Sequence, residues 1–294
     1  MNQQKTVFAK THNNLQGIVR LTLIQLILAS LIYQQNALGP LWLKLLFSVL
    51  IGFVLSGMIN LAHECLHQKF AGHRWLNYSV GRVAASLLLV NFTVFKWHHL
   101  FHHQYVGTDK DTENNADFKT LSQYLVALSG LRLAKKKIAS SFAVLGQQYP
   151  YYINTQKQKS EAYYDSLILL IFLLILLSLT CFYPQHMLFA YWLPLLFAYS
   201  GIMFFAIPEH NGCKPIKGYY SLARSVFTNR LVRFFMWNGN FHAEHHIHPG
   251  ALPYVLKDIC EKEKNYIWYR EKSYLKWHYR LLKKLVIQPT VEEK

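Results

Sequence analysis

Four long runs of apolar residues dominate the chain, and each is long enough to cross a bilayer, which needs about 20 helical residues. They cover approximately Gly17–Tyr33, Leu41–Asn60, Ser166–Tyr183 and Met187–Ile207. The third run contains no charged residue, whereas the first contains Arg20, which is close enough to one end to snorkel toward water. The pattern predicts an all-α integral membrane protein with four transmembrane helices, over residues 17–33, 41–60, 166–183 and 187–207.

Two shorter segments do not fit a spanning helix. Val83–Phe95 is apolar but only 13 residues long, a length that favours a re-entrant or interfacial segment. Ser221–Trp237 has apolar residues near helical spacing with arginines between them. It predicts an amphipathic helix, either at the membrane surface or packed on the polar part of the protein. A crossing by the first segment would place His63 and His99 on opposite sides of the membrane.

The positive charge is distributed unevenly around these spans. The chain contains 31 lysines and arginines and has a formal net charge of +16 at pH 7. Segments 61–165 and 208–294 contain 12 and 15 of these basic residues, whereas the short connections 34–40 and 184–186 contain none. This asymmetry is the positive-inside pattern, so we expect both long segments and both termini in the cytoplasm. No recognisable nucleic-acid-binding module accompanies the basic residues, and we expect no nucleic-acid partner.

Nine of the 15 histidines gather in three clusters and one single site. The first cluster is HECLH, the second and third each contain the pattern H-x-x-H-H, and the single site is P-E-H-N. Their histidines are His63, His67, His99, His102, His103, His210, His242, His245 and His246. Neutral imidazole is a nitrogen ligand that suits iron, zinc and copper. Burial of so many imidazoles without a metal would leave many polar atoms to satisfy, so the clusters predict a metal site.

The spacings place these rings on shared helix faces. His63 and His67 are four residues apart on the helix that continues the second span, so both rings project from one face. An H-x-x-H-H segment can offer two rings to one ion and one ring to a neighbouring ion. His63 and His210 lie 22 and 23 residues beyond the starts of their spans. Both therefore emerge just past a hydrocarbon core about 30 Å thick, at matching depth.

The motifs HECLH, HHLFHH and FHAEHH occur in this order between pairs of expected spans. In this arrangement they resemble the three histidine boxes of the membrane fatty acid desaturase superfamily, and the resemblance covers about Leu41 to Tyr254. It implies a single domain over residues 1–294, with a cytoplasmic helical cap that carries the boxes. It also implies a non-haem centre of two iron ions that uses O2 to attack a C–H bond. The nine histidines would be the iron ligands, with His98 a rival for His99 because some relatives use H-x-x-x-H-H.

Acidic residues beside the boxes would then accept the distal imidazole N–H groups and fix the orientation of the rings. The candidates are Glu64, Asp109, Asp111, Glu209 and Glu244. The alternative is that these residues are solvated loop charges.

Three functions are compatible with the motifs. The first is desaturation of a fatty acyl chain, and the second is hydroxylation or ketolation of a carotenoid, an alkane or another small apolar molecule by the same superfamily. The third is zinc proteolysis, because His63-Glu64-x-x-His67 also matches the H-E-x-x-H pattern. The first two need an external electron donor of the ferredoxin or cytochrome b5 type, because the sequence contains no C-x-x-C pair or Gly-rich dinucleotide loop.

Overall fold

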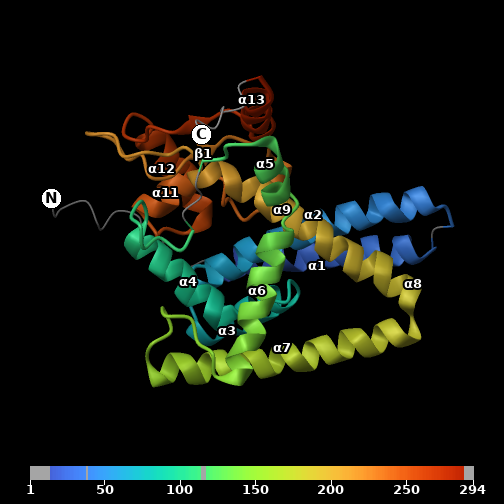
Figure 1. The fold of residues 1–294 in the computed structure, drawn as a ribbon. Helices are drawn as coiled ribbons and strands as arrows, with labels where there is room; N and C mark the ends of the chain where they lie inside the picture. The colour runs from blue at the N-terminus through green and yellow to red at the C-terminus, as the bar shows by residue number, and fades with distance from the viewer. Residues whose placement is uncertain (1–13, 38, 114–116, 288–294) are drawn as a thin grey trace, which may run out of the picture.

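The computed structural model describes residues 14–37, 39–113 and 117–287 and is almost entirely helical (Figure 1). Its four long apolar helices confirm the expected spans. They are α1 (Asn14–Ala37), α2 (Leu41–Leu66), α7 (Gln156–Phe182) and a continuous helix made of α8 (Pro184–Met187), one π-helical turn (Leu188–Trp192) and α9 (Leu193–His210). Each span extends beyond the apolar run that predicts it. The chain is therefore a multi-pass membrane protein.

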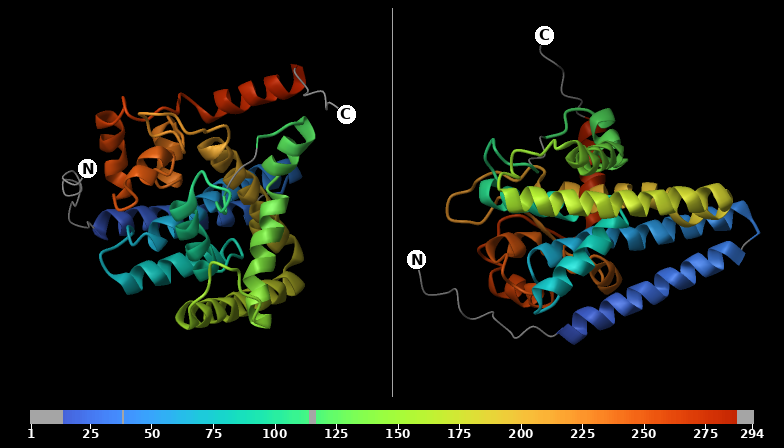
Figure 2. Two further views of the ribbon diagram at one scale, coloured as in Figure 1. Left: turned by 60° about the vertical axis from the view of Figure 1, so that its left-hand side comes forward. Right: turned by 90° about the horizontal axis from the view of Figure 1, so that it is seen from below.

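The second and fourth spans form the centre of the bundle, because α2 packs closely along α9. Gly52 makes this possible. A Cβ atom at Gly52 would lie 2.6 Å from Phe197 Cβ and 2.8 Å from the carbonyl oxygen of Pro194, so only glycine lets the backbones approach so closely. Figure 2 shows α1 and α7 on either side of this central pair. Many apolar side chains of α1 and α7 are exposed on their outer faces, as lipid contact requires.

The apolar segment 83–95 does not form one continuous helix. It is divided between α3 (Arg74–Ser86) and α4 (Phe92–Tyr105) by a break at residues 87–91. Tyr191 and Tyr199 of the fourth span donate hydrogen bonds to the carbonyl oxygens of Leu87 and Leu88, at 3.2 and 2.7 Å. These bonds satisfy carbonyl groups that the break leaves without helical partners. The chain turns back at this point, and His63 and His99 come together.

The start of α4 is fastened to the third span by buried polar groups. The Asn91 side chain caps α4 by accepting from the Val94 N–H at 2.8 Å, and its amide nitrogen donates to the Ala162 carbonyl and to Ser166 Oγ. On the same helix α7, Asp165 accepts from Thr93. These bonds set the position of the helix that carries the second histidine cluster.

Short helices build the remainder of the cap. They are α5 (Leu121–Leu128), α6 (Leu131–Ala143), α10 (Arg230–Phe235), α11 (His242–Ile247), α12 (Leu256–Lys262) and α13 (Tyr274–Ile287), with 3-10 turns at Val144–Gly146 and Pro253–Val255. Two parallel strands, β1 (Ser225–Val226) and β2 (Arg270–Glu271), pair between them.

The expectation of one amphipathic helix over Ser221–Trp237 is wrong. Residues 225–226 form β1, and helix begins only after Asn229, whose side chain accepts from the Val232 N–H. The helix α10 ends after six residues, and Trp237 follows with a positive φ of 52°. Pairing of β1 with the distant strand β2 replaces the local helical preference with tertiary hydrogen bonds.

Candidate metal centre

Four helix ends converge on one region at the cap end of the bundle (Figure 1). His63 lies in the last turn of α2, and His67 caps its C-terminus. His210 is the last residue of α9, while α4 and α11 contribute the second and third clusters. Residues from four elements that are far apart in sequence thus meet where the second and fourth spans leave the apolar part of the bundle.

All nine histidines singled out in the sequence belong to two adjoining groups. One group contains His63, His67, His99, His103 and His245, and the other contains His102, His210, His242 and His246. Within each group the candidate ligand nitrogens all lie within 4.8 Å of one another. The groups are neighbours, because the ring centroids of His103 and His246 are 4.4 Å apart.

Each H-x-x-H-H cluster divides its rings between the two groups, and the two clusters divide them in opposite ways. His99 and His103 of α4 join the first group, while His102 between them joins the second. In α11, His242 and His246 join the second group, and His245 joins the first. The outer histidines of each cluster are four residues apart and share a helix face, whereas the middle histidine points to a different side.

The rings face each other with their Nε2 atoms. The Nε2–Nε2 distance is 2.9 Å between His63 and His99 and also between His103 and His245. In the second group, His242 Nε2 lies 2.8 Å from His210 Nε2 and 3.1 Å from His246 Nε2. These nitrogens surround two positions, one in each group, where an ion shared by the rings would lie.

In five of the nine rings, Nδ1 faces an acceptor on the outside of the groups. His210 Nδ1 lies 2.9 Å from the carbonyl oxygen of Leu222, which can only accept. His210 Nδ1 therefore carries the proton, and its Nε2 presents a lone pair to the interior. His63 Nδ1 lies 3.1 Å from Glu64 Oε1, a carboxylate acceptor that favours the same tautomer.

A pair of metal ions fits this arrangement. In the Nδ1-protonated tautomer, lone pairs point at one another across about 3 Å, which is repulsive unless a cation lies between them. His67 Nε2 is buried and has no hydrogen-bond partner within the described residues, so an ion would also satisfy this orphan nitrogen. The donor set is all imidazole nitrogen, which suits iron, copper or zinc.

Burial keeps most of these rings neutral and hence ready to bind a cation. It lowers the pKa of His99, His245 and His246 well below the ordinary value, and neighbouring histidines lower it further. For His103 the same causes lower the pKa to about 3. His102 differs, because Glu113 and Asp111 outweigh the effect of burial and raise its pKa.

Three of the expected acidic residues lie against the rings. Glu64 faces His63, and Asp111 Oδ1 lies 2.6 Å from His102 Nδ1. Glu209 Oε2 lies 3.7 Å from His242 Nδ1. Asp111 is itself held by the N–H groups of Gly107 and Glu113, at 3.3 and 2.9 Å. These contacts orient the rings from outside the two groups.

The other two acidic residues lie elsewhere. Asp109 is exposed in the turn after α4. Glu244 is buried but accepts a hydrogen bond from the Ser225 hydroxyl of β1.

Sequence reasoning also missed Glu113, whose Oε1 lies 3.4 Å from His99 Nδ1. The sequence did offer a signal for Glu113, because acidic residues occur at the alternate positions 109, 111 and 113, and only the first two of these were singled out.

His98 lies outside both groups, although it is adjacent to His99. Its Nδ1 lies 3.2 Å from Glu113 Oε1 and 3.5 Å from Lys137 Nζ, and its ring packs edge-on against Tyr152. Adjacent helical residues point about 100° apart, so only one of the two histidines can face the first group.

Comparison with known proteins gives a family and a set of partial relatives. The family model described as fatty acid desaturase matches residues 40–279. An omega-6 fatty acid desaturase of the endoplasmic reticulum from Brassica juncea is 35% identical over 79 residues, or 25% of this chain and 21% of the relative. An sn-1 oleoyl-lipid 12-desaturase from Anabaena variabilis is 31% identical over 94 residues, or 32% of this chain and 26% of the relative.

A third relative, a Delta(12) fatty acid desaturase from Calendula officinalis, is 42% identical over 62 residues, 21% of this chain. The chain thus aligns with no more than about a quarter of the length of these three proteins. The zinc-protease interpretation of His63-Glu64-x-x-His67 is not supported, because both rings share a group with three histidines from other helices. The family match covers most of the chain and includes every histidine of the two groups, and the chain therefore belongs to the fatty acid desaturase family.

Proposed function

We propose that the protein is a membrane-bound, O2-dependent desaturase that introduces a double bond into the acyl chain of a lipid. The observation that carries the proposal is the gathering of nine histidines into two adjoining groups in a member of the fatty acid desaturase family. The relatives described above are all named as acyl desaturases. Their names favour desaturation over the hydroxylation or ketolation of a carotenoid or alkane.

Two iron ions are the proposed cofactor, one in each group. His63, His67, His99, His103 and His245 would hold one ion, and His102, His210, His242 and His246 the other. When bound, the iron pair would supply the activation of O2 that allows an unactivated C–H bond to be broken, which side chains alone cannot do.

The protein's own groups prepare this centre. Glu64, Asp111 and Glu209 approach the outer nitrogens of three rings and hold their inner nitrogens toward the ions. The rings of His99, His102, His242 and His245 are buried, which limits the access of water to the reaction. The substrate chain would enter from the apolar side, where the spans of α2 and α9 end.

The orientation and the electron source complete the proposal. The basic segments 61–165 and 208–294 would lie in the cytoplasm together with the histidines. Electrons would come from a separate ferredoxin or cytochrome b5 type donor that docks on this basic face. Such docking depends on charge, so turnover with an acidic donor should fall as the ionic strength rises.

Lipid analysis of cells that express the full chain tests the proposal. A new double bond, seen as a loss of two hydrogens from an acyl chain, is the expected result, and His245→Ala should abolish it. Metal analysis of the purified protein should find two irons per chain. Addition of one oxygen to the product would favour hydroxylation instead, and a single zinc per chain would overturn the iron centre.

A further inference from the structure

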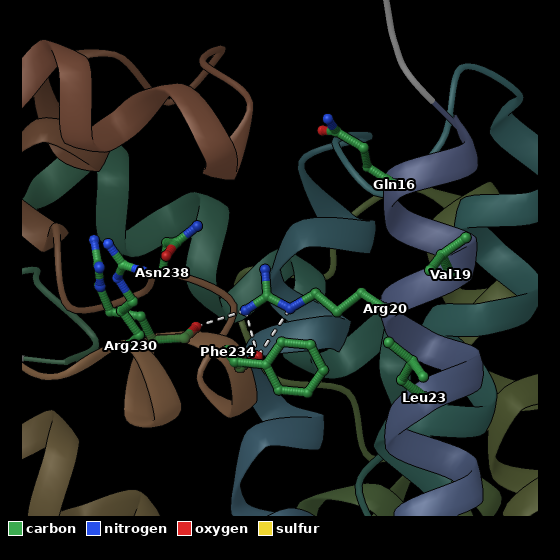
Figure 3. Close-up of a pocket in the computed structure, with 8 residues that line it drawn as sticks. Gln16, Val19, Arg20, Leu23, Arg230, Phe234 and Asn238 are labelled. Carbon is green, nitrogen blue, oxygen red and sulfur yellow. Dashed lines mark hydrogen bonds between the residues drawn. The ribbon is translucent and has the colours of Figure 1, made fainter.

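A basic pocket lies beside the first span, and none of the nine clustered histidines is among the residues that line it (Figure 3). It has a volume of about 460 Å³ and lies between the start of α1 and helix α10. The described residues that line it are Gln16, Val19, Arg20, Leu23, Arg230, Arg233, Phe234 and Asn238. Three arginines and no acidic residue are among these side chains, so the pocket favours an anion.

Arg20 connects α1 to α10 at one side of the pocket. Its Nε donates to the Phe234 carbonyl at 2.8 Å, and its Nη2 donates to the Arg233 carbonyl at 2.5 Å. The guanidinium also lies over the Trp237 ring, 4.4 Å from the centroid. Figure 3 shows the remaining nitrogen of Arg20 pointing away from these bonds, and Nη1 has no hydrogen-bond partner within the described residues.

Arg230 and Arg233 provide the free positive charge. They are three residues apart on α10 and so share a helix face, where two like charges repel unless an anion lies between them. Neither makes an ion pair within the described part of the chain. Arg233 Nε is buried without any hydrogen-bond partner there, which is costly for a charged group and indicates a missing acceptor.

The position and the apolar wall of the pocket identify the kind of anion. Arg20 lies five residues into the first apolar helix, which begins at Leu15, and is therefore about 8 Å along its axis and close to the end of the span that faces one headgroup region. Val19 and Leu23 of this helix are 46% exposed and form an apolar part of the lining, and Gln16 and Asn238 add polar groups to it. A ligand with a phosphate and adjoining acyl chains matches both parts.

We propose that this pocket binds the phosphate of a membrane glycerophospholipid, with Arg230 and Arg233 as the phosphate ligands and Arg20 Nη1 as a third donor. None of the nine clustered histidines lines the pocket, so the proposal does not depend on the desaturase activity. It assigns a lipid-binding site to the junction between α1 and α10. Bidentate guanidinium groups are well suited to phosphate oxygens.

Binding of phosphatidylglycerol to the purified full-length protein in detergent tests the site. Native mass spectrometry or a fluorescence titration would compare three probes, namely phosphatidylglycerol, diacylglycerol without phosphate and glycerol 3-phosphate without acyl chains. We expect the double variant Arg230→Gln/Arg233→Gln to bind phosphatidylglycerol at least about tenfold more weakly than the wild type. Arg132→Gln, which removes an exposed arginine from α6, should bind as the wild type does.

Each other result overturns the proposal in a distinct way. Equal binding of diacylglycerol would show that the phosphate is not recognised, and equal binding of glycerol 3-phosphate would identify a site for a soluble phosphate. If the double variant unfolds at the wild-type temperature and still binds phosphatidylglycerol with unchanged affinity, the two arginines do not bind the phosphate. If the double variant does not fold, the single variant Arg230→Gln gives the same comparison, because Arg230 is exposed.

Discussion

Asp165 of α7 accepts two hydrogen bonds from Thr93 of α4, one from the backbone N–H at 2.9 Å and one from the hydroxyl at 2.6 Å. Thr93 lies in the first turn of α4, where backbone N–H groups have no helical partner. The other carboxylate oxygen accepts from Arg82 of α3 at 2.6 Å. One buried carboxylate therefore joins three helices and sets the position of the helix that carries His99.

Replacement of this carboxylate should destabilise the fold. Asp165→Ala removes the partner of the Arg82 guanidinium and leaves the Thr93 N–H unsatisfied, at a cost of about 3 kcal/mol. Thermal unfolding of the purified protein should show the lower stability. Glu261→Ala removes an exposed carboxylate from α12 and should have no measurable effect. An unfolding temperature of Asp165→Ala equal to that of the wild type would contradict the anchoring role.

Two adjacent histidines should differ in their effect on metal content. His99→Ala removes a ring that lies 2.9 Å from His63 Nε2, and it should reduce bound iron below two per chain and abolish turnover. His98→Ala removes a ring outside both groups and should retain its iron. Elemental analysis of both purified variants makes the comparison. Normal iron content in His99→Ala, or loss of iron only in His98→Ala, would reverse the assignment of these two residues.

Asp111 and Asp109 form a second matched pair. Asp111→Ala leaves the His102 Nδ1 without its acceptor, so metal affinity should fall about 10- to 100-fold. Asp109→Ala removes an exposed carboxylate from the same turn and should change the affinity little. A chelator competition titration measures both affinities. Equal affinities in the two variants would show that Asp111 does not orient the ring.

Gly57 couples the second span to the segment before the third histidine cluster. A Cβ atom there would lie 2.1 Å from the Phe235 carbonyl oxygen at the end of α10. Gly57→Ala should therefore cost about 1–3 kcal/mol of stability through overpacking. Gly146→Ala introduces a methyl group with no heavy atom within 4 Å and should be neutral. Similar thermal unfolding of the two variants would argue against the close contact.

Membrane sidedness can be measured independently of the metal. Single cysteines introduced at Lys157 and Lys257 should both be labelled by an impermeant reagent only from the cytoplasmic side, in a background without the four native cysteines. A cysteine introduced at Gly39 should be labelled only from the opposite side. Labelling of 157 and 257 from different sides would place the histidine clusters across the bilayer from each other and exclude a shared centre.

The sequence predicted the four spans because transfer of apolar side chains into lipid is a local property, which is summed along each run of residues. The nine histidines were also recognisable, since the spacings of three and four residues depend only on the geometry of a helix. Both predictions need no knowledge of what packs against what. For the same reason they could not assign a ring to one group or the other.

Tertiary structure decided how the chain uses those residues. The rotation of α4 is set by Asn91 and its bonds to the third span, and this rotation directs His99, rather than His98, toward the first group. Glu113 reaches His99 because the turn after α4 folds back, and Ser225 forms a strand because β2 offers it a partner. These outcomes depend on contacts between residues far apart in the sequence, whose energies no local pattern contains.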